Sequence, residues 1–272
     1  MLEIALIQLR TPASQGSALQ QAEPLIREAA ASGASLIVTP EGSNLLQRNR
    51  GHLYEVLTSM EEDEAVLGLQ ALASELGVWL LIGSAMVLRS DGKAANRSIL
   101  VDPRGRIVAT YDKLHMFDVD LPTGERHRES SVYEPGDRAV VAQANGASLG
   151  LTICYDLRFP ALHRALARSG ADILTVPAAF TRPTGEAHWE VLLRARAIET
   201  GSFVIAAAQG GLHEDGRQTW GHSMVVGPWG EVLALADHDD PCVLRVSIDL
   251  AEVGKARSAI PALENARAFV SQ

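Results

Sequence analysis

The chain has few cysteines, no long apolar run and no excess of positive charge. Its two cysteines, Cys154 and Cys242, are too few for a disulfide framework to stabilise a fold of 272 residues. They could pair in principle, but thiols normally stay reduced in the cytosol, so we expect free thiols in a cytoplasmic protein. The first residues lack the basic start and apolar core of a signal peptide. No stretch of about 18 apolar residues could form a membrane-spanning helix, so we expect no membrane partner.

The charge and composition of the chain also exclude some classes of protein. The net charge of −9 argues against nucleic acid as the main partner, because phosphate binding requires clustered cations. Hydrophobic residues make up 47% and charged residues 21%, a composition typical of a folded protein rather than a disordered one. The length fits one α/β domain with a sizeable core, and no repeat or linker divides it. We expect a single domain over residues 1–272.

Apolar runs rich in Ile, Val and Leu alternate with amphipathic stretches along the chain. The runs predict strands at 3–9, 35–39, 78–84, 96–101, 106–111, 138–142, 147–153, 172–176, 203–208, 223–227, 231–235 and 242–248. The amphipathic stretches predict helices at 17–32, 62–76, 160–169 and 185–200. Turn residues between neighbouring strands predict hairpins at 96–111 and 223–235. Such an order suggests a mixed sheet, or two sheets, covered by helices.

Two segments fall outside this alternation. The stretch 112–137 is polar and too long for a plain connection, and long loops in compact domains are often functional. The residues after about 249 form a tail of helix and loop, and one place for such a tail is an interface with a second subunit. The segment 209–211 is expected to be a loop. Its glycines lack the order of a phosphate-binding loop, so no phosphate site is expected there.

Cys154 stands where a strand gives way to a helix. The apolar run 147–153 precedes it, and Pro160 suits the first turn of the helix that follows. At such a turn a cysteine is exposed at the sheet edge, close to backbone N–H groups that can stabilise a thiolate or an oxyanion. The alternative is a buried structural cysteine, which is the commoner role of an unpaired cysteine.

Glu41 and Lys113 also follow strands. Glu41 closes the run 35–41 and so lies at a carboxyl end, where α/β proteins bind ligands. Lys113 follows the run 106–112, and its ammonium would lower the pKa of a nearby cysteine and make a thiolate available at neutral pH. An ordinary surface acid and an ordinary surface lysine are the alternatives. Together, however, the three residues supply the base, cation and nucleophile that acyl transfer requires.

The motifs around these residues resemble those of the nitrilase superfamily. Glu41 lies in Thr-Pro-Glu-Gly, Lys113 in Tyr-Asp-Lys-Leu-His and Cys154 in Ile-Cys-Tyr-Asp-Leu-Arg-Phe-Pro. Their order and spacing also match, and the resemblance covers essentially the whole chain. The segments 187–200, 206–209 and 221–226 are similar to the Nit-type branch, which includes ω-amidases and deaminated-glutathione amidases.

The resemblance implies a four-layer αββα sandwich that forms a homodimer or a higher homo-oligomer and uses no metal or organic cofactor. It implies that Cys154 attacks an amide carbonyl, that Glu41 is the general base, and that a thioester forms before ammonia and acid are released. Lys113 and the backbone N–H of Tyr155 would stabilise the oxyanion. Glu129 matches a second acid that would orient the lysine or the substrate.

The same resemblance places further residues near the mouth of the site: Tyr155, Arg158, Phe180, Thr181 and His188. Packing is as good an explanation for each of them as substrate contact. Tyr155 stands where true nitrilases usually have Trp, which favours amides over nitriles. Arg158 or Arg182 could pair with a substrate carboxylate, because guanidinium binds carboxylates bidentately. The histidines show no metal-binding spacing, so no metal site is expected.

The hypothesis that follows is an amidase for a small carboxylate-bearing amide, such as an ω-amide of an α-keto acid or deaminated glutathione. One alternative is a carbamoyl-amide or aliphatic amide hydrolase of the same superfamily. Another is a binding protein that has lost its chemistry, although the presence of Glu41, Lys113, Glu129 and Cys154 argues against it.

Overall fold

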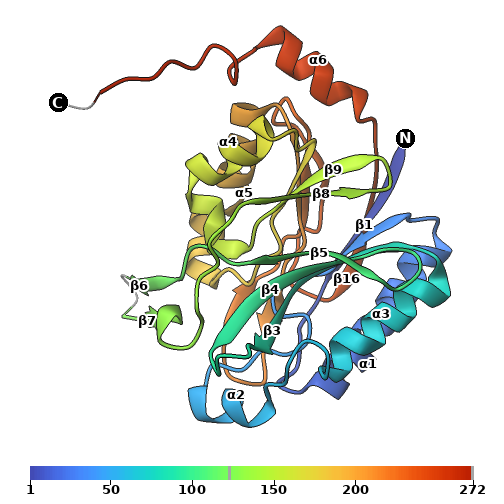
Figure 1. The fold of residues 1–272 in the computed structure, drawn as a ribbon, viewed down its shortest axis with the longest axis vertical. Helices are drawn as coiled ribbons and strands as arrows, with labels where there is room; N and C mark the ends of the chain where they lie inside the picture. Colours follow the sequence, from blue (N-terminus) through green and yellow to red (C-terminus); the bar gives the residue numbers. More distant parts are fainter. Residues whose placement is uncertain (122–123, 271–272) are drawn as a thin grey trace.

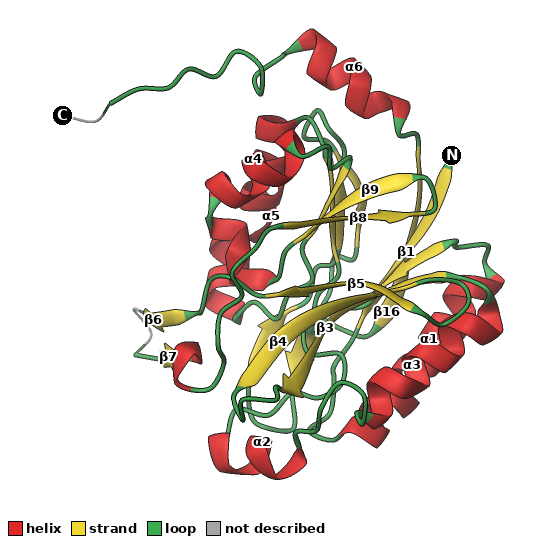
Figure 2. Cartoon of the chain, in the orientation of Figure 1, coloured by secondary structure: helices red, strands yellow, loops and turns green. Residues whose placement is uncertain are grey.

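The computed structural model describes residues 1–121 and 124–270. Two six-stranded sheets pack face to face, and helices cover the outer face of each (Figure 1). The layers are therefore helix, sheet, sheet and helix, as the colouring by secondary structure makes plain (Figure 2). This confirms the four-layer αββα sandwich predicted from the sequence.

The first sheet carries the N-terminal half of the fold and one late strand. Its order is β16 (Cys242–Ile248), β1 (Leu2–Gln8), β2 (Leu36–Val38), β3 (Trp79–Leu88), β4 (Ala94–Val101) and β5 (Ile107–Asp112). Strands β1, β2 and β3 are parallel, whereas β4 is antiparallel to both β3 and β5. It follows that β5 runs in the same direction as β2, so their carboxyl ends meet at one edge of the sheet.

The second sheet follows the same plan. Its order is β15 (Val232–Leu235), β14 (Met224–Val226), β11 (Phe203–Ala206), β10 (Ile173–Thr175), β9 (Ala147–Leu151) and β8 (Val140–Ala144). Strands β9, β10 and β11 are parallel. The predicted strands all appear in one sheet or the other, and both predicted hairpins are present as β4–β5 and β14–β15.

Two pairs of helices form the outer layers. Helices α1 (Gln15–Ala31) and α3 (Glu64–Leu76) cover the first sheet, and α4 (Pro160–Arg168) and α5 (Arg182–Thr200) cover the second (Figure 1). Gly77 and Gly201 end α3 and α5 in the left-handed conformation, at φ of 66° and 57°, which glycine adopts without the cost of a Cβ clash.

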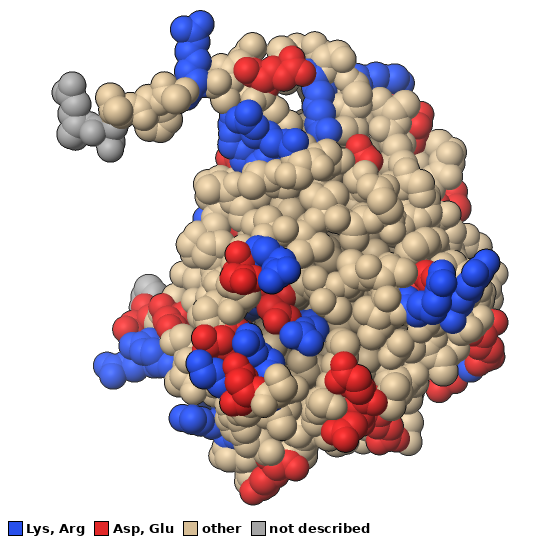
Figure 3. Space-filling view, in the orientation of Figure 1, with Lys and Arg blue, Asp and Glu red and all other residues tan. Residues whose placement is uncertain are grey.

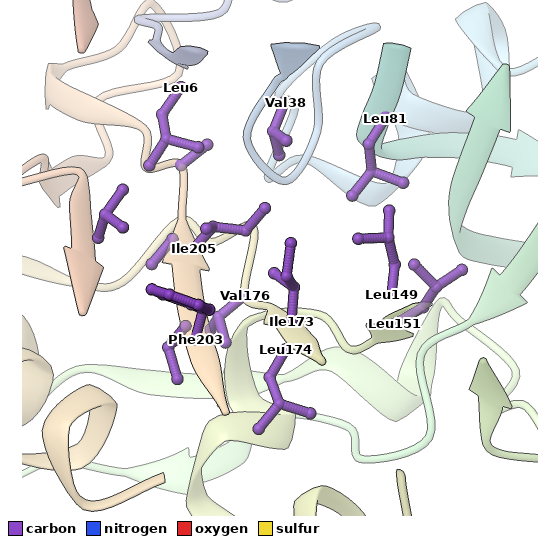
Figure 4. Close-up of a cluster of buried hydrophobic side chains, with 14 of the residues drawn as sticks. Leu6, Val38, Leu81, Leu149, Leu151, Ile173, Leu174, Val176, Phe203 and Ile205 are labelled. Carbon is purple, nitrogen blue, oxygen red and sulfur yellow. The ribbon is translucent and has the colours of Figure 1, made fainter. Parts of the chain in front are cut away.

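Period-two alternation along β1 explains why the sheets are buried on both faces. Ile4 and Leu6 belong to the core between the sheets, whereas Ala5 and Ile7 belong to the core beneath α1 and α3. In Figure 4 the side chain of Leu6 points toward that of Ile205, on the opposite sheet. Complete burial of each large aliphatic side chain contributes roughly 1.5–3 kcal/mol, so both cores contribute substantially to the stability of the fold.

The sequence did not predict several short elements. These are α2 (Arg50–Val56) and two small hairpins, β6 (Asp118–Asp120) with β7 (Arg126–Arg128), and β12 (Gly210–Leu212) with β13 (Gln218–Trp220). The prediction of a loop at 209–211 was wrong, because β12 begins at Gly210. A Cβ on Gly210 would lie 2.2 Å from the carbonyl oxygen of Asp239, so this strand requires glycine and carries none of the apolar alternation by which strands are recognised.

The C-terminal tail contains helix α6 (Ala251–Ala259) and then runs away from the body of the molecule (Figure 1). Val253 is the buried residue of α6. Phe269 and Val270 are 91% and 90% exposed, which is unusual for two apolar side chains. Within residues 1–121 and 124–270, no helix is both long and apolar enough to cross a membrane.

Candidate active site

The predicted residues meet where the carboxyl ends of the two sheets face each other. Glu41 lies shortly beyond β2, Lys113 directly follows β5, and Cys154 lies shortly beyond β9 of the opposite sheet. Gly83 makes this approach possible, because a Cβ there would lie 1.9 Å from the carbonyl oxygen of Thr39 and 2.5 Å from Pro177. The segment just before Glu41 and the segment at Pro177, which follows β10 of the second sheet, therefore approach the same point of β3.

The backbone of Cys154 is strained. Its φ is +50°, a left-handed conformation that costs a residue other than glycine roughly 1–3 kcal/mol. Its N–H donates to the carbonyl oxygen of Pro177 at 2.9 Å, and it opens a short 3₁₀ helix, η2 (Cys154–Arg158). Strain of this kind at a strand-to-helix turn exposes a nucleophile to substrate in other hydrolases.

Asp156 holds this turn in place. Its Oδ2 accepts hydrogen bonds from the N–H of Ile153 at 2.9 Å and from the hydroxyl of Tyr111 at 2.6 Å. Its Oδ1 accepts the backbone N–H of His115 at 3.1 Å. Because Tyr111 and His115 flank Lys113 in sequence, one fully buried carboxylate ties the cysteine segment to the lysine segment.

Lys113 lies between two carboxylates. Its Nζ is 3.0 Å from Oε1 of Glu41 and 2.8 Å from Oε1 of Glu129, and its side chain is 2% exposed. The Oε2 atom of each carboxylate accepts a backbone hydrogen bond. The N–H of Ala179 donates to Glu41 at 2.8 Å, and the N–H of Phe117 donates to Glu129 at 2.6 Å. The structure thus brings Glu41, Lys113 and Glu129 together in one buried cluster.

The charges in this cluster support one another. Burial disfavours the charged form of Lys113, but Glu129 and Glu41 outweigh it and hold its pKa well above the usual value. Burial would likewise raise the pKa of Glu41, yet the charge of Lys113 and the hydrogen bonds to the carboxylate bring it below the usual value. At neutral pH Glu41 is therefore ionised and able to accept a proton.

The expectation of a ready-made thiolate at Cys154 was wrong. Burial and then the charge of Glu41 raise the pKa of the thiol well above its ordinary value, and Lys113 only partly offsets this rise. The reason is geometric, since Lys113 is already engaged by two carboxylates. The resting thiol is protonated, so a nucleophile here requires a base that removes its proton during attack.

A cavity of about 570 Å³ opens above the cluster. Its lining includes Glu41, Lys113, Glu129 and Cys154, together with Tyr155, Arg158, Phe180 and Thr181 from the set predicted to lie at its mouth. His188 is not among the lining residues. It is exposed, and its Nδ1 lies 3.3 Å from a guanidinium nitrogen of Arg158, which does line the cavity.

Arg182, the other predicted partner for a carboxylate, lies elsewhere. It is not among the cavity-lining residues, and its guanidinium pairs with Asp239 at 3.2 Å. Arg158 remains at the cavity, with its guanidinium 5.4 Å from the centre of the Phe180 ring.

Asn96 belongs to the cluster and was not predicted. Its Nδ2 donates to Glu41 Oε1 at 2.8 Å and lies 3.4 Å from Glu129 Oε1. Its Oδ1 is buried and has no hydrogen-bond partner among the described residues. The sequence offered little signal for Asn96, because Arg97 and Ser98 follow it in β4 and a polar side chain is not unusual beside them.

Comparison with known proteins identifies the fold and the family. Residues 3–258 match the family model described as "Carbon-nitrogen hydrolase". The chain belongs to the carbon–nitrogen hydrolase family. This confirms both the resemblance found in the sequence and the class of enzyme expected from it.

Three relatives illustrate the similarity. The deaminated glutathione amidase of Yersinia enterocolitica is 41% identical over 271 residues, covering 98% of this chain and 93% of that protein. The NitFhit protein of C. elegans is 34% identical with a TM-score of 0.91, over 98% of this chain and 65% of that longer chain. An amidase variant from Nesterenkonia sp. AN1 is 26% identical with a TM-score of 0.82, over 98% and 94% of the two chains. That structure shows covalent addition of the acetamide moiety of fluoroacetamide at the active-site cysteine.

The contacts of Asn96 generate a testable prediction. In Asn96→Leu the Glu41 carboxylate loses a donor that favours its charged form, so it becomes protonated at higher pH. If Glu41 acts as a base, kcat/KM falls by about 10–100-fold, and the acidic limb of its pH profile moves toward neutrality. A pH series of initial rates measures this shift.

Gln143→Leu provides the matched control, because it makes the same kind of change on an exposed residue of β8. It should leave the pH profile unchanged. A folded Asn96→Leu enzyme with an unshifted acidic limb would show that Asn96 does not help to keep Glu41 ionised.

Proposed function

We propose that this carbon–nitrogen hydrolase cleaves the amide bond of a small carboxylate-bearing amide through a thioester on Cys154. The observation that carries the proposal is the placement of a protonated thiol, an ionised Glu41 and a buried Lys113 at the base of one cavity. Deaminated glutathione and ω-amides of α-keto acids are the leading substrates, in keeping with the name of the Yersinia enterocolitica relative.

In the first half-reaction Cys154 Sγ attacks the amide carbonyl carbon while Glu41 accepts the thiol proton. Negative charge then develops on the carbonyl oxygen, where Lys113 and the backbone N–H of Tyr155 stabilise it. Collapse of this intermediate breaks the C–N bond, and Glu41 returns the proton to the leaving nitrogen. A primary amide releases ammonia, and a secondary amide such as deaminated glutathione releases an amine.

In the second half-reaction water replaces the leaving group. Glu41 takes a proton from the water as its oxygen attacks the thioester, the C–S bond breaks, and the proton passes to Sγ. The carboxylic acid product then departs. Glu129 touches Lys113 rather than the reacting atoms, so its role is to position the ammonium between the two carboxylates.

The charge of the cavity wall favours an anionic substrate. Six basic residues line it, namely Arg48, Lys113, Arg126, Arg128, Arg158 and Arg217, against the acids Glu41, Glu125 and Glu129. The whole chain, in contrast, has a net charge of −9. A basic cavity in an acidic protein concentrates anions at the site and leaves cations outside it.

Hydrolysis of short aliphatic amides is the second candidate. The structural similarity to the Nesterenkonia amidase supports it, because that protein was captured with a small acetamide group on its cysteine. The basic cavity gives such neutral substrates no advantage, and this is why we place them second.

We also propose that the chain folds as a single domain and forms a homodimer in the cytoplasm. In this dimer the tail from about residue 249 packs on the partner subunit. The exposed Phe269 and Val270 support this arrangement, as does the scarcity of charged side chains on the face below α6 (Figure 3). A reducing compartment suits an enzyme that depends on an unpaired Cys154.

Removal of the nucleophile should abolish turnover. Cys154→Ala should lower kcat by at least about 10⁴-fold, because no thioester can form. Mass spectrometry of the wild-type enzyme mixed with substrate should detect an acyl group on Cys154. Cys242→Ala is the control, since that cysteine lies on the edge strand β16 and outside the cavity lining, and it should keep full activity. A Cys154→Ala enzyme that still hydrolyses amides would disprove the nucleophile assignment.

The substrate proposal predicts a specific order of kcat/KM values. Deaminated glutathione and α-ketoglutaramate should be hydrolysed about 10–100-fold more efficiently than propionamide, because a charge-assisted pair contributes about 1.5–3 kcal/mol. The corresponding nitriles should be poor substrates. Release of amine or ammonia measures each rate. If propionamide were turned over equally well, the aliphatic amidase candidate would replace the leading one.

The tail proposal predicts a change in self-association. Light scattering after gel filtration should give a dimer for the full chain. Replacing both Phe269 and Val270 by Ser should raise the dissociation constant by about tenfold or more, since each buried apolar side chain contributes roughly 1.5–3 kcal/mol. Leu67→Ser, on the exposed surface of α3, should not change it. A monomeric full chain at micromolar concentration would refute the proposed dimer.

A further inference from the structure

Three basic or imidazole side chains reach the active-site cavity from three separate segments. Arg48 comes from the stretch before α2, His127 from strand β7, and Arg217 from the turn between β12 and β13. None of these segments belongs to the two large sheets, and the sequence analysis singled out none of the three residues. Their convergence on one cavity is a product of the fold.

The turn that carries Arg217 is rigid. Its ends are joined by a hydrogen bond from the N–H of His213 to the carbonyl oxygen of Arg217 at 2.9 Å. The imidazole of His213 is buried between Thr219 Oγ1 at 2.7 Å and the carbonyl oxygen of Thr11 at 3.3 Å. Asp215 Oδ1 accepts the backbone N–H of Arg217 at 2.9 Å. The guanidinium therefore extends from a fixed base and loses little freedom on binding a ligand.

The hydrogen-bonding capacity of the two guanidinium groups is largely unused. Among the described residues, the Arg48 side chain has no hydrogen-bond or ion-pair partner. Arg217 forms an ion pair with Asp215, whose Oδ2 lies 3.4 Å from a guanidinium nitrogen, but this buried Oδ2 accepts no hydrogen bond in the described part of the chain.

Other arginines at the cavity are already engaged. Arg128 makes two hydrogen bonds of 2.9 Å to Asp120, and Arg158 contacts His188 and the Phe180 ring. Arg126 is 80% exposed and lies 3.5 Å from Asp120. Arg126 and Arg217 are both ion-paired at a similar distance, but Arg217 is 29% exposed against 80% for Arg126 and extends from a hydrogen-bonded turn. Arg48 and Arg217 are therefore the basic residues of this wall that we expect to accept a new anionic partner.

The three groups also lie within electrostatic range of one another. Burial lowers the pKa of His127; Glu125 opposes this effect, while the positive charges of Arg217 and Arg48 add to it. His127 is consequently a neutral ring at pH 7, able to donate one hydrogen bond beside two permanent cations.

We propose that Arg48, His127 and Arg217 form a subsite for an anionic group of the substrate that is remote from the scissile amide. The inference rests on the proposed function and adds the residues that select among carboxylate-bearing amides. The ligand group is a carboxylate, because two guanidinium groups and a ring N–H supply paired donors for its two oxygens. Substrates that carry a second carboxylate, as deaminated glutathione does on its glycine, are those the subsite favours.

The experiment compares two forms of one substrate in wild-type and Arg217→Gln enzymes. Deaminated glutathione carries the glycine carboxylate, and its glycine methyl ester lacks that charge. We expect Arg217→Gln to raise KM for the acid by about 10–100-fold and to leave kcat, and the KM for the ester, nearly unchanged. Arg48→Gln should also raise KM for the acid. Arg217→Lys should raise it less than Arg217→Gln does, because lysine keeps the positive charge but lacks the paired N–H donors of the guanidinium group.

A binding measurement separates this inference from the proposed function. Calorimetry on the Cys154→Ala protein gives the dissociation constant of deaminated glutathione without turnover, and the same measurement on Cys154→Ala with Arg217→Gln should show weaker binding by the same factor. Arg182→Gln is the matched control, because that arginine pairs with Asp239 outside the cavity. It should leave both KM and binding unchanged.

The possible results are distinct. Wild-type cleavage of deaminated glutathione with no change in KM or binding in Arg217→Gln would overturn the subsite while leaving the amidase proposal intact. Equal losses for the acid and its ester would also overturn it, since they would indicate general damage to the cavity. Failure of the wild-type enzyme to cleave or bind any carboxylate-bearing amide would refute the proposed function, and the subsite with it.

Discussion

The ion cluster of Lys113 with Glu41 and Glu129 is the constraint on which the site depends. Charges buried without partners cost several kcal/mol each, so the cluster persists only while all of its members are present. Its members lie beyond the ends of β2 and β5 and directly after β7, so all three come from the first sheet and the segment that follows it. The second sheet reaches the cluster through Ala179, which lies beyond β10 and donates its backbone N–H to Glu41 at 2.8 Å. A displacement of that sheet would therefore remove a donor from a buried carboxylate.

This arrangement determines which group holds the mobile proton. Because Lys113 is neutralised by two carboxylates, it cannot ionise the thiol of Cys154 as an isolated cation would. The proton stays on sulfur and the charge stays on Glu41 until a substrate arrives. In the proposed mechanism attack and proton transfer are then one event, and a buried thiol that is not ionised at rest is also protected from oxidation.

The sequence predicts the parts of this enzyme that are set locally. Strand ends and their flanking motifs identify Glu41, Lys113 and Cys154, and alternation within apolar runs identifies the strands that form the two sheets. Other residues gain their importance only through contacts between distant segments. Asn96 donates to Glu41 across 55 positions of sequence, and Arg217 reaches the cavity from a hairpin that lacks apolar periodicity. Arg182 and His188 show the opposite case. Both lie close in sequence to residues of the site, yet Arg182 pairs with Asp239 and His188 is exposed.

In the proposed mechanism, catalysis and substrate selection lie on different parts of the fold. The proposed catalytic groups lie just beyond the ends of β2, β5 and β9, where buried ion pairs and hydrogen bonds fix their position within narrow limits. The basic wall of the cavity comes from short loops and hairpins that contribute little to the main cores. Substitution in those loops can change which carboxylates are accepted without disturbing the ion cluster, whereas a change in the cluster affects every substrate. One arrangement of Cys154, Glu41 and Lys113 can therefore serve amides of different size and charge, with the wall rather than the cluster deciding among them.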